Sequence, residues 1–310
     1  MMNLATPLKF LCLSAFTAAL IATPALAAPI SAPLPAPVAE MIRAAVASGN
    51  AITLTAVVET AKKTNPDAIA EIDALTARFK AETEARHKEK LARQEALDGW
   101  KGQGEAGAAN TTGNTEGTNA ALGLHFTREG LRWDQTFDIT ADYQRSDGVT
   151  TKSRYFAAYN ARYKFDGPFY ATGLLSWENN RFAGFRRRLT ESLGFGYTII
   201  DSPDLTLSAE GGPALRQTRH VEDNATDNSI ALRAAVRNRW AILPTLTFTE
   251  DFSYYADSRN STIVSETALN VALTGTLSAR LSYLIQYESD PPPPLENTDT
   301  LTRLTLVYSF

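Results

Sequence analysis

The clearest pattern in the chain lies in residues 131–146, LRWDQTFDITADYQRS, where apolar and polar positions alternate. Such alternation predicts a β-strand with one apolar face and one polar face. Strands of soluble proteins usually have about five or six residues. About ten tilted residues with aromatic side chains near both ends are typical of a membrane-spanning strand. Trp133 and Tyr143 occupy those places on the apolar face, so we expect this segment to cross a membrane.

The alternation continues from Trp100 to Phe310 and divides this part of the chain into strands. The predicted strands are residues 100–110, 118–128, 131–146, 152–165, 169–178, 189–200, 205–219, 230–243, 246–257, 262–274, 277–288 and 301–310. An even number is what bacterial outer-membrane barrels need. The sequence therefore predicts an all-β fold, namely a transmembrane antiparallel up-and-down β-barrel of about 12 strands, preceded by a short α-helical region.

The predicted connections differ in length between the two sides of this barrel. Those after every second strand are short, whereas the others are mostly longer and polar, ending with SDPPPPLENTD. This parity is typical of an outer-membrane barrel and places the helices and Phe310 on the periplasmic side. A soluble sandwich of two sheets, which also alternates, has no reason to keep it. Glu191, Asn238 and Glu250 fall on the apolar phase, so they need a rim position, a bulge or a different register.

The first residues resemble a secretory signal. Lys9 precedes an apolar run over residues 10–21, and Ala25-Leu26-Ala27 supplies small residues before a cleavage point. We expect a signal peptide over residues 1–27; the apolar run is too short for a membrane anchor, and Lys9 disfavours a lipoprotein site at Cys12. Cleavage removes Cys12, the single cysteine, and leaves no thiol for a disulfide, a metal site or a nucleophile.

Between the signal and the barrel we expect two further segments. Residues 28–37 form a Pro/Ala-rich tether, and residues 38–98 a helical periplasmic extension, with Asn65 as a helix cap and Pro66 at the first helical position. The barrel then occupies residues 99–310. The end of the helical region, KAETEARHKEKLARQE, is polar all round. This stretch, which includes His87, is either a solvated arm or a contact for a partner or for the barrel mouth.

Composition excludes some classes of protein. No run of eighteen apolar residues exists beyond the N-terminus, which excludes a helical membrane protein. The net charge is −4, and loss of Lys9 makes it −5, because no other charged residue precedes Ala27. A mildly acidic chain disfavours a nucleic-acid partner.

The polar phases of the strands predict ion pairs inside the barrel. Strand pairing places Asp134 opposite Arg162, Asp142 opposite Arg154, and Arg237 opposite Asp251. Two interpretations are open: a lumen filled by mutually satisfied ion pairs, or a water-filled path with weak ion preference. A barrel of this size lies between filled eight-stranded and open sixteen-stranded barrels, so the strand number does not decide.

Catalytic chemistry finds little support in the barrel residues. Only His125 and His220 remain there, and neither has a recognisable arrangement with a serine and an orienting carboxylate. No phosphate-binding loop or metal-ligand spacing is present, so we expect no enzyme, no cofactor and no metal. A barrel enzyme that uses His125 or His220 is the least favoured alternative.

Arginines gather near the rim with the predicted longer loops. They are Arg181, Arg186, Arg187, Arg188, Arg216, Arg219 and Arg259. Guanidinium groups suit phosphate oxygens. We therefore expect Arg186, Arg187, Arg188 and Arg219 to contact outer-membrane lipid, lipopolysaccharide in particular; the alternative is ordinary solvated loops.

Four short motifs, taken in order, carry a family resemblance. They are Gly113-Asn114-Thr115, Gly194-Phe195-Gly196-Tyr197, Glu210-Gly211-Gly212 and the ending Leu306-Val307-Tyr308-Ser309-Phe310. Residues 100–310 resemble the salt-induced outer-membrane protein family, an outer-membrane barrel domain of unknown function. The resemblance implies an outer-membrane location and a link to salt or envelope stress, and it supplies no catalytic or ligand residues.

The terminal alternation of Leu304, Leu306, Tyr308 and Phe310 also looks like the signal read by the barrel-assembly machinery. We therefore expect a non-enzymatic outer-membrane barrel with a role in envelope integrity or salt and osmotic stress. The alternative is a narrow passive channel for ions or small solutes.

Overall fold

A computed structural model describes residues 34–95, 97–112, 117–146, 149–258, 260–291, 293 and 295–310. The expected signal peptide, residues 28–33 of the expected tether, the Gly113-Asn114-Thr115 motif and Arg259 lie outside the described residues.

In the described residues from 34 onward, three helices and one 3-10 turn precede the barrel. They are α1 (Ala36–Ala47), α2 (Ala51–Thr64), η1 (Pro66–Ala68) and α3 (Ile69–Ala92). Ile42, Ile72 and Phe79 are buried between the helices and form the centre of a small core. The first helix begins two residues before the predicted residue 38, because Pro37 lies in its first turn, where a missing N–H costs nothing.

Asn50 and Asn65 have exchanged the roles that the sequence suggested for them. Asn50, expected only to break the helix, caps α2 by accepting a hydrogen bond from the Thr53 N–H at 2.9 Å. Asn65, predicted as the next cap, instead donates from Nδ2 to the carbonyl of Ala61, 3.0 Å away, and closes the end of α2.

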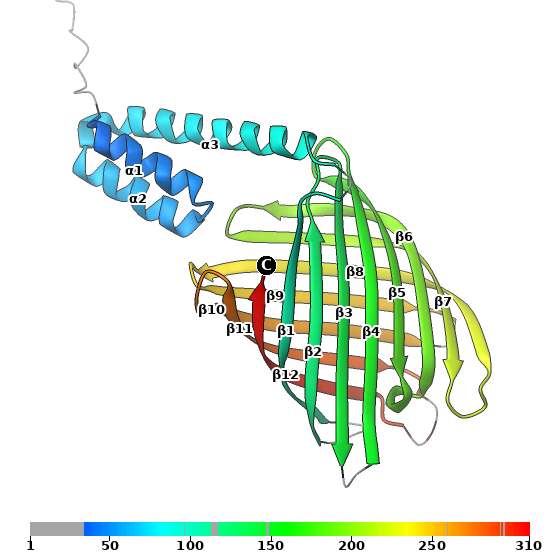
Figure 1. The fold of residues 1–310 in the computed structure, drawn as a ribbon. Coiled ribbons are helices and arrows are strands. Elements are labelled where there is room, and N and C mark those ends of the chain that lie inside the picture. Colours follow the sequence, from blue (N-terminus) through cyan, green and yellow to red (C-terminus); the bar gives the residue numbers. More distant parts are fainter. Residues whose placement is uncertain are drawn as a thin grey trace, which may run out of the picture.

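The long helix α3 joins the small core to the barrel (Figure 1). Its polar half carries ion pairs with four-residue spacing, including Lys88–Glu84 at 2.7 Å. The Lys88 ammonium holds the pKa of Glu84 below its ordinary value. His87 Nε2 lies 3.1 Å from Glu129 Oε1 in the turn after the second strand. The arm therefore contacts the barrel mouth, as one of the two interpretations of this stretch required. None of the described helices is long and apolar enough to cross a membrane.

Twelve antiparallel strands form one closed barrel in which every strand pairs with its neighbours in sequence, and the first pairs with the last. The strands are β1 (Trp100–Thr112), β2 (Gly117–Arg128), β3 (Trp133–Ser146), β4 (Val149–Lys164), β5 (Phe169–Asn180), β6 (Phe185–Asp201), β7 (Leu205–His220), β8 (Thr226–Leu243), β9 (Leu246–Ala256), β10 (Ser261–Ala272), β11 (Leu277–Glu288) and β12 (Thr298–Ser309). We call the end that bears Trp100 and Phe310 the helical end, and the opposite end the distal end.

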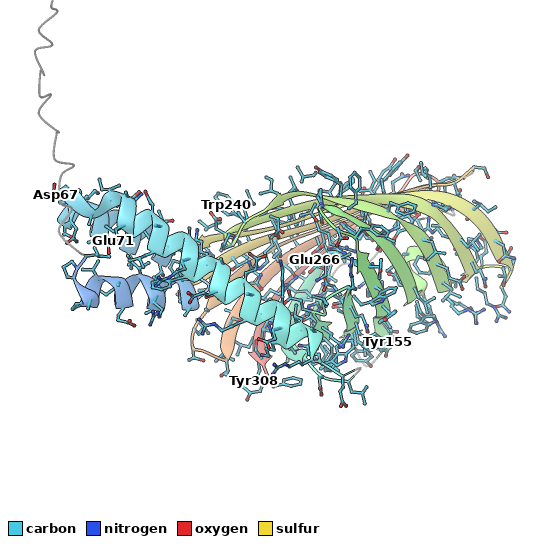
Figure 2. The ribbon with its side chains drawn as sticks, turned by 90° about the horizontal axis from the view of Figure 1, so that it is seen from above. Asp67, Glu71, Tyr155, Trp240, Glu266 and Tyr308 are labelled. Carbon is cyan, nitrogen blue, oxygen red and sulfur yellow. The ribbon has the colours of Figure 1, made fainter. Side chains whose placement is uncertain are left out.

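The barrel is apolar outside and polar inside. Ile230 is 75 % exposed on the outer wall, whereas Asp142 is 0 % exposed in the interior. Figure 2 shows Tyr155 and Trp240 on the outside of the barrel and Glu266 within it. The exposed outer wall includes Leu122, Leu175, Leu193, Phe195, Leu215, Ile230, Leu232, Leu281, Leu304 and Leu306. This inversion requires an apolar surrounding, and the fold is therefore a transmembrane barrel.

The predicted difference in loop length between the two ends is wrong. Ten of the eleven connections have between 2 and 5 residues, and only residues 289–297 form a longer one. The strands continue into residues predicted as loops, for example residues 185–188 in β6 and 226–229 in β8. Most residues of these strand ends are polar on both faces. The alternation of apolar and polar residues is therefore absent there, and the sequence looks like that of a loop.

Glu191, Asn238 and Glu250 face outward, and no bulge or rim position removes them from the outer wall. Glu191 lies between the exposed Leu175 and Leu215 in the ladder. Asn238 lies opposite Glu250. Glu250 accepts hydrogen bonds from the hydroxyls of Ser265, at 2.6 Å, and Thr267.

Candidate functional site: the polar lumen

The barrel is flattened, and side chains from opposite walls meet inside it. A circular barrel of twelve strands, about 4.8 Å apart and tilted by roughly 40°, would be about 24 Å across. Arg188 on β6 and Glu288 on β11 lie on nearly opposite walls, yet Arg188 Nη1 lies 2.5 Å from Glu288 Oε1. Figure 1 shows the green strands β2 to β4 crossing the orange and red strands β10 to β12 at a steep angle, as the tilt of the strands requires.

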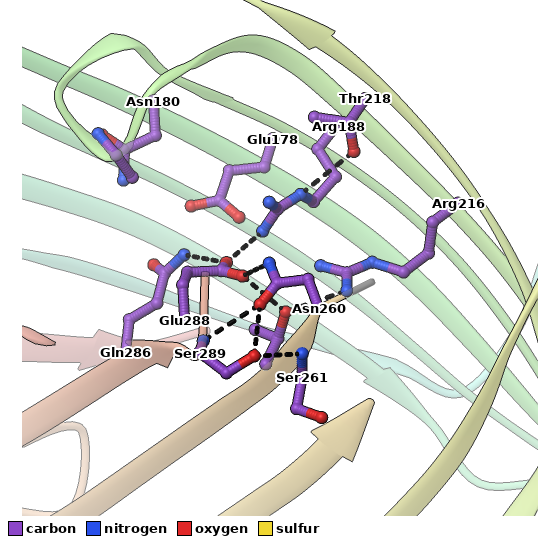
Figure 3. Close-up of polar contacts among 12 residues, drawn as sticks. Glu178, Asn180, Arg188, Arg216, Thr218, Asn260, Ser261, Gln286, Glu288 and Ser289 are labelled. Atoms are coloured by element: carbon purple, nitrogen blue, oxygen red, sulfur yellow. Dashed lines mark hydrogen bonds and ion pairs between the residues drawn. The ribbon is translucent and has the colours of Figure 1, made fainter. Parts of the chain in front are cut away.

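Glu288 is the centre of the distal polar cluster (Figure 3). Its carboxylate accepts hydrogen bonds from Arg188, from Asn260 Nδ2 at 2.6 Å and from Thr262 Oγ1 at 2.8 Å. Arg216 Nη1 donates to Thr262 Oγ1 at 2.9 Å. The cluster thus joins β6 and β7 to β10 and β11 through buried groups.

A second contact crosses the lumen between β12 and β3. Arg303 donates from Nε and Nη2 to the two oxygens of Asp142, at 2.9 and 2.8 Å. Arg154 lies 3.7 Å from the same carboxylate and donates from Nε to Glu178 at 2.8 Å. Together with the Glu288 cluster, these pairs lie in the distal half of the lumen.

Glu210 organises a third cluster, nearer the helical end. Its carboxylate lies 2.8 Å from Arg233, 3.1 Å from Arg237 and 3.5 Å from Arg162. The Tyr170 hydroxyl donates to it at 3.4 Å. Arg237 also lies 3.5 Å from Asp251, so the three guanidinium groups share two carboxylates.

The rest of the lumen is open to water. The side chain of Asp251 is 57 % exposed, although it points into the barrel. The side chains of His125 and Asp138, which contact each other, are 44 % and 38 % exposed. We call this solvated part of the lumen the vestibule; the ion pairs toward the distal end are buried.

The family described as "Protein of unknown function, DUF481" matches residues 104–310. The chain belongs to this family. The Escherichia coli (strain K12) protein named "Uncharacterized protein YdiY" is 26 % identical over 212 residues, which are 68 % of this chain and 83 % of that protein. The family resemblance inferred from the sequence is thus confirmed.

Solved outer-membrane barrels match this chain at low identity. The NanC porin has 9 % identity and a TM-score of 0.47, and the match covers 66 % of this chain and 98 % of that chain. The translocator domain of the autotransporter NalP from Neisseria meningitidis has 11 % identity and a TM-score of 0.43, over 77 % of this chain and 98 % of that chain. The COG4313 outer membrane channel from Pseudomonas putida F1 has 11 % identity and a TM-score of 0.43, over 70 % of this chain and 98 % of that chain. At these TM-scores nothing about function follows.

In this DUF481 barrel, glycines of two sequence motifs allow neighbouring backbone and side-chain atoms to approach the strand closely. A Cβ atom on Gly212 would lie 2.2 Å from the carbonyl oxygen of Leu193, and one on Gly196 would lie 2.2 Å from the ring of Tyr170. Gly196 therefore leaves room for the Tyr170 ring, which lies across β6 and reaches Glu210 on β7. The glycine motifs are visible in the sequence, but only the pairing of β5 with β6 shows that the Tyr170 ring packs on Gly196.

The structure brings together two of the three predicted lumen pairs. Asp142 lies 3.7 Å from Arg154, and Asp251 lies 3.5 Å from Arg237. Asp134 and Arg162 are opposite each other in the ladder, yet they do not pair. Lys164 Nζ forms the ion pair with Asp134, at 2.8 Å, and Arg162 forms one with Glu210 instead. The long arginine side chain passes over the Tyr170 ring, 5.0 Å from its centroid, and reaches the buried carboxylate on β7, which is the stronger partner.

The histidines that the enzyme alternative required do not form a triad in the described part of the chain. His125 contacts Asp138, and His220 Nε2 lies 3.3 Å from Asp227. No serine hydroxyl is bonded to either ring among the described residues. Within the same residues no group of three or more potential ligands could hold a metal ion.

The predicted rim arginines divide between two faces. Arg186, Arg187 and Arg219 line a recess of about 270 Å³ on the outer wall at the distal end. Arg188 and Arg216 point into the lumen, so including Arg188 among lipid contacts was wrong. The strand period explains why the consecutive Arg187 and Arg188 face opposite sides. Arg186 lies in the register shift between Phe185 and Arg187, where the strict alternation is broken, so it lines the same recess as Arg187.

The C-terminal residues have the outward arrangement that their alternation predicted. Leu306, Tyr308 and Phe310 are exposed on the outer wall. Phe310 exchanges both backbone hydrogen bonds with Gly102 and so helps to close the barrel between β12 and β1.

Proposed function

We propose that this DUF481 protein is a non-enzymatic outer-membrane barrel that serves envelope integrity under salt or osmotic stress and is closed at rest. One observation carries the closure: buried arginine–carboxylate pairs join separated parts of the wall through the lumen. Arg188–Glu288, at 2.5 Å, joins nearly opposite strands, and Arg303–Asp142, at 2.8 Å, joins strands that are three places apart. Breaking such a pair leaves an uncompensated charge in a buried site, which costs about 3–5 kcal/mol. The pairs therefore resist opening, and salt screens them less than it screens surface pairs.

The proposed orientation places the helical end in the periplasm. An exported chain reaches the outer membrane from the periplasm, and an even number of strands returns its C-terminus to the same side. The small helical core and the arm α3 would then stand in the periplasm.

Conductance in planar bilayers tests the closure. We expect no steady conductance from the wild type, and channels from the double variant R188Q/E288Q, which removes both partners of this pair while Arg216 keeps its hydrogen bond to Thr262. The matched control is R132Q/D166N, which removes an exposed ion pair of 3.1 Å near the helical end. Wild-type conductance equal to that of R188Q/E288Q would refute the closure.

The envelope role needs a cellular test. We expect a strain that lacks the protein to grow poorly at high salt and to admit large antibiotics, and the wild-type gene to restore both properties. Normal growth and normal permeability in the deletion strain would refute this role.

A narrow passive channel is the second candidate, and the solvated vestibule favours it. Asp138 and Asp251 face water there, close to basic side chains such as Arg280. Such mixed charge predicts weak ion selectivity. A conducting wild type whose selectivity changes in D251N would favour this function over the closed barrel.

A further inference from the structure

Three arginines on the outer wall face one another without acidic partners. Arg187 on β6 lies directly opposite Arg219 on β7, and Arg186 lines the same recess. Like charges in directly opposed positions destabilise a sheet. Among the described residues no carboxylate forms an ion pair with these three side chains; Arg219 Nε donates to Asn224 Oδ1 at 2.9 Å. The positive charges of these three arginines are therefore not balanced by ion pairs with described carboxylates.

The recess has the lining of an anion site beside an apolar surface. Its volume is about 270 Å³, and Trp177, Asn179 and Asn224 complete the wall around the arginines. The asparagine amides can donate hydrogen bonds, and each guanidinium presents a planar fork of donors that matches phosphate oxygens.

The recess lies beside the apolar outer wall, so a ligand bound there would be a component of the membrane. Trp177 pairs in the ladder with Leu189, and Leu215 and Ile230, farther from the distal end, are exposed on the same wall. A ligand in this recess has its charged group against the arginines and an apolar body against this wall. Tryptophan favours the boundary between membrane and water, which is where lipid phosphates lie.

We propose that Arg186, Arg187 and Arg219 bind the phosphate groups of lipopolysaccharide in the outer leaflet. Arg188 is excluded from this site because it is held in the lumen by Glu288. The bound lipid neutralises the opposed arginines and anchors the distal rim in the leaflet. This binding does not depend on whether the lumen conducts.

Lipid binding by the folded protein tests the proposal. Purified barrel in detergent is titrated with diphosphoryl lipid A, dephosphorylated lipid A, phosphatidylglycerol and inorganic phosphate. We expect diphosphoryl lipid A to bind the wild type at least ten times more tightly than the other three. In R187Q/R219Q we expect this preference to be lost.

Two controls separate binding from folding. R187K/R219K keeps the charge without the planar fork and should lie between the wild type and R187Q/R219Q. R78Q/R86Q removes two arginines from α3, whose side chains are 59 % and 73 % exposed, and should bind like the wild type. Every variant must retain the heat-dependent electrophoretic shift of a folded barrel. Unchanged lipid A binding by folded R187Q/R219Q would overturn the proposal, and equal binding of phosphatidylglycerol by the wild type would overturn the assignment to lipopolysaccharide.

Discussion

Arg303 on β12 donates two hydrogen bonds, of 2.9 and 2.8 Å, to the carboxylate of Asp142 on β3 inside the barrel. The two strands are separated along the wall by β1 and β2. This geometry is the strong, bidentate form of an arginine–carboxylate pair.

The first prediction concerns the cost of breaking this pair. D142N removes both bidentate hydrogen bonds of the buried Arg303 and leaves it only Glu266, at 3.7 Å, so we expect the barrel to lose about 3–5 kcal/mol of unfolding free energy. The double variant D142N/R303Q removes both charges and should recover most of that loss. Urea unfolding in lipid bilayers measures both values. A double variant as unstable as the single variant would contradict the pairwise interpretation.

The second prediction concerns orientation. The single cysteine, Cys12, lies in the expected signal peptide, so an introduced cysteine can be labelled alone. We expect E222C, in the distal turn between β7 and β8, to react with an impermeant maleimide on intact cells. K80C on α3 should react only after the outer membrane is permeabilised. The opposite result would place the helices outside the cell.

The third prediction concerns Gly196. A Cβ atom at this position would lie 2.2 Å from the Tyr170 ring, so G196A should push that ring off Glu210 and cost about 1–3 kcal/mol. Gly104 is the matched control, because a Cβ atom there meets only Leu124, at 3.7 Å. Adding Y170A to G196A should relieve the clash. Equal stability of G196A and G104A would show that the Tyr170 contact is unimportant.

The fourth prediction concerns the C-terminal aromatic residue. If Phe310 is part of the assembly signal, F310A should lower the amount of folded barrel in the outer membrane several-fold. F169A removes another exposed outer-wall aromatic and should reduce the amount less. Outer-membrane fractions compared by heat-dependent electrophoretic mobility supply the measurement. Equal loss in both variants would indicate that general apolar surface, rather than chain position, controls assembly.

The sequence by itself determined the barrel, its twelve strands and which face of each strand meets the lumen. The reason is local: side chains alternate with a period of two, so the pattern in residues 131–146 already assigns Trp133 to the outer wall and Asp142 to the lumen. Neighbouring strands are joined by short turns, so the register that opposes Asp142 and Arg154 could also be derived.

Only the tertiary structure decided which polar side chains meet across the lumen. The pairing of Arg188 with Glu288, residues 100 positions apart, depends on how far the closed sheet flattens. The same long-range geometry lets Arg162 pair with Glu210 rather than with Asp134. Strand period and ladder register act between neighbours, whereas the distance between opposite walls depends on the twist of the whole sheet.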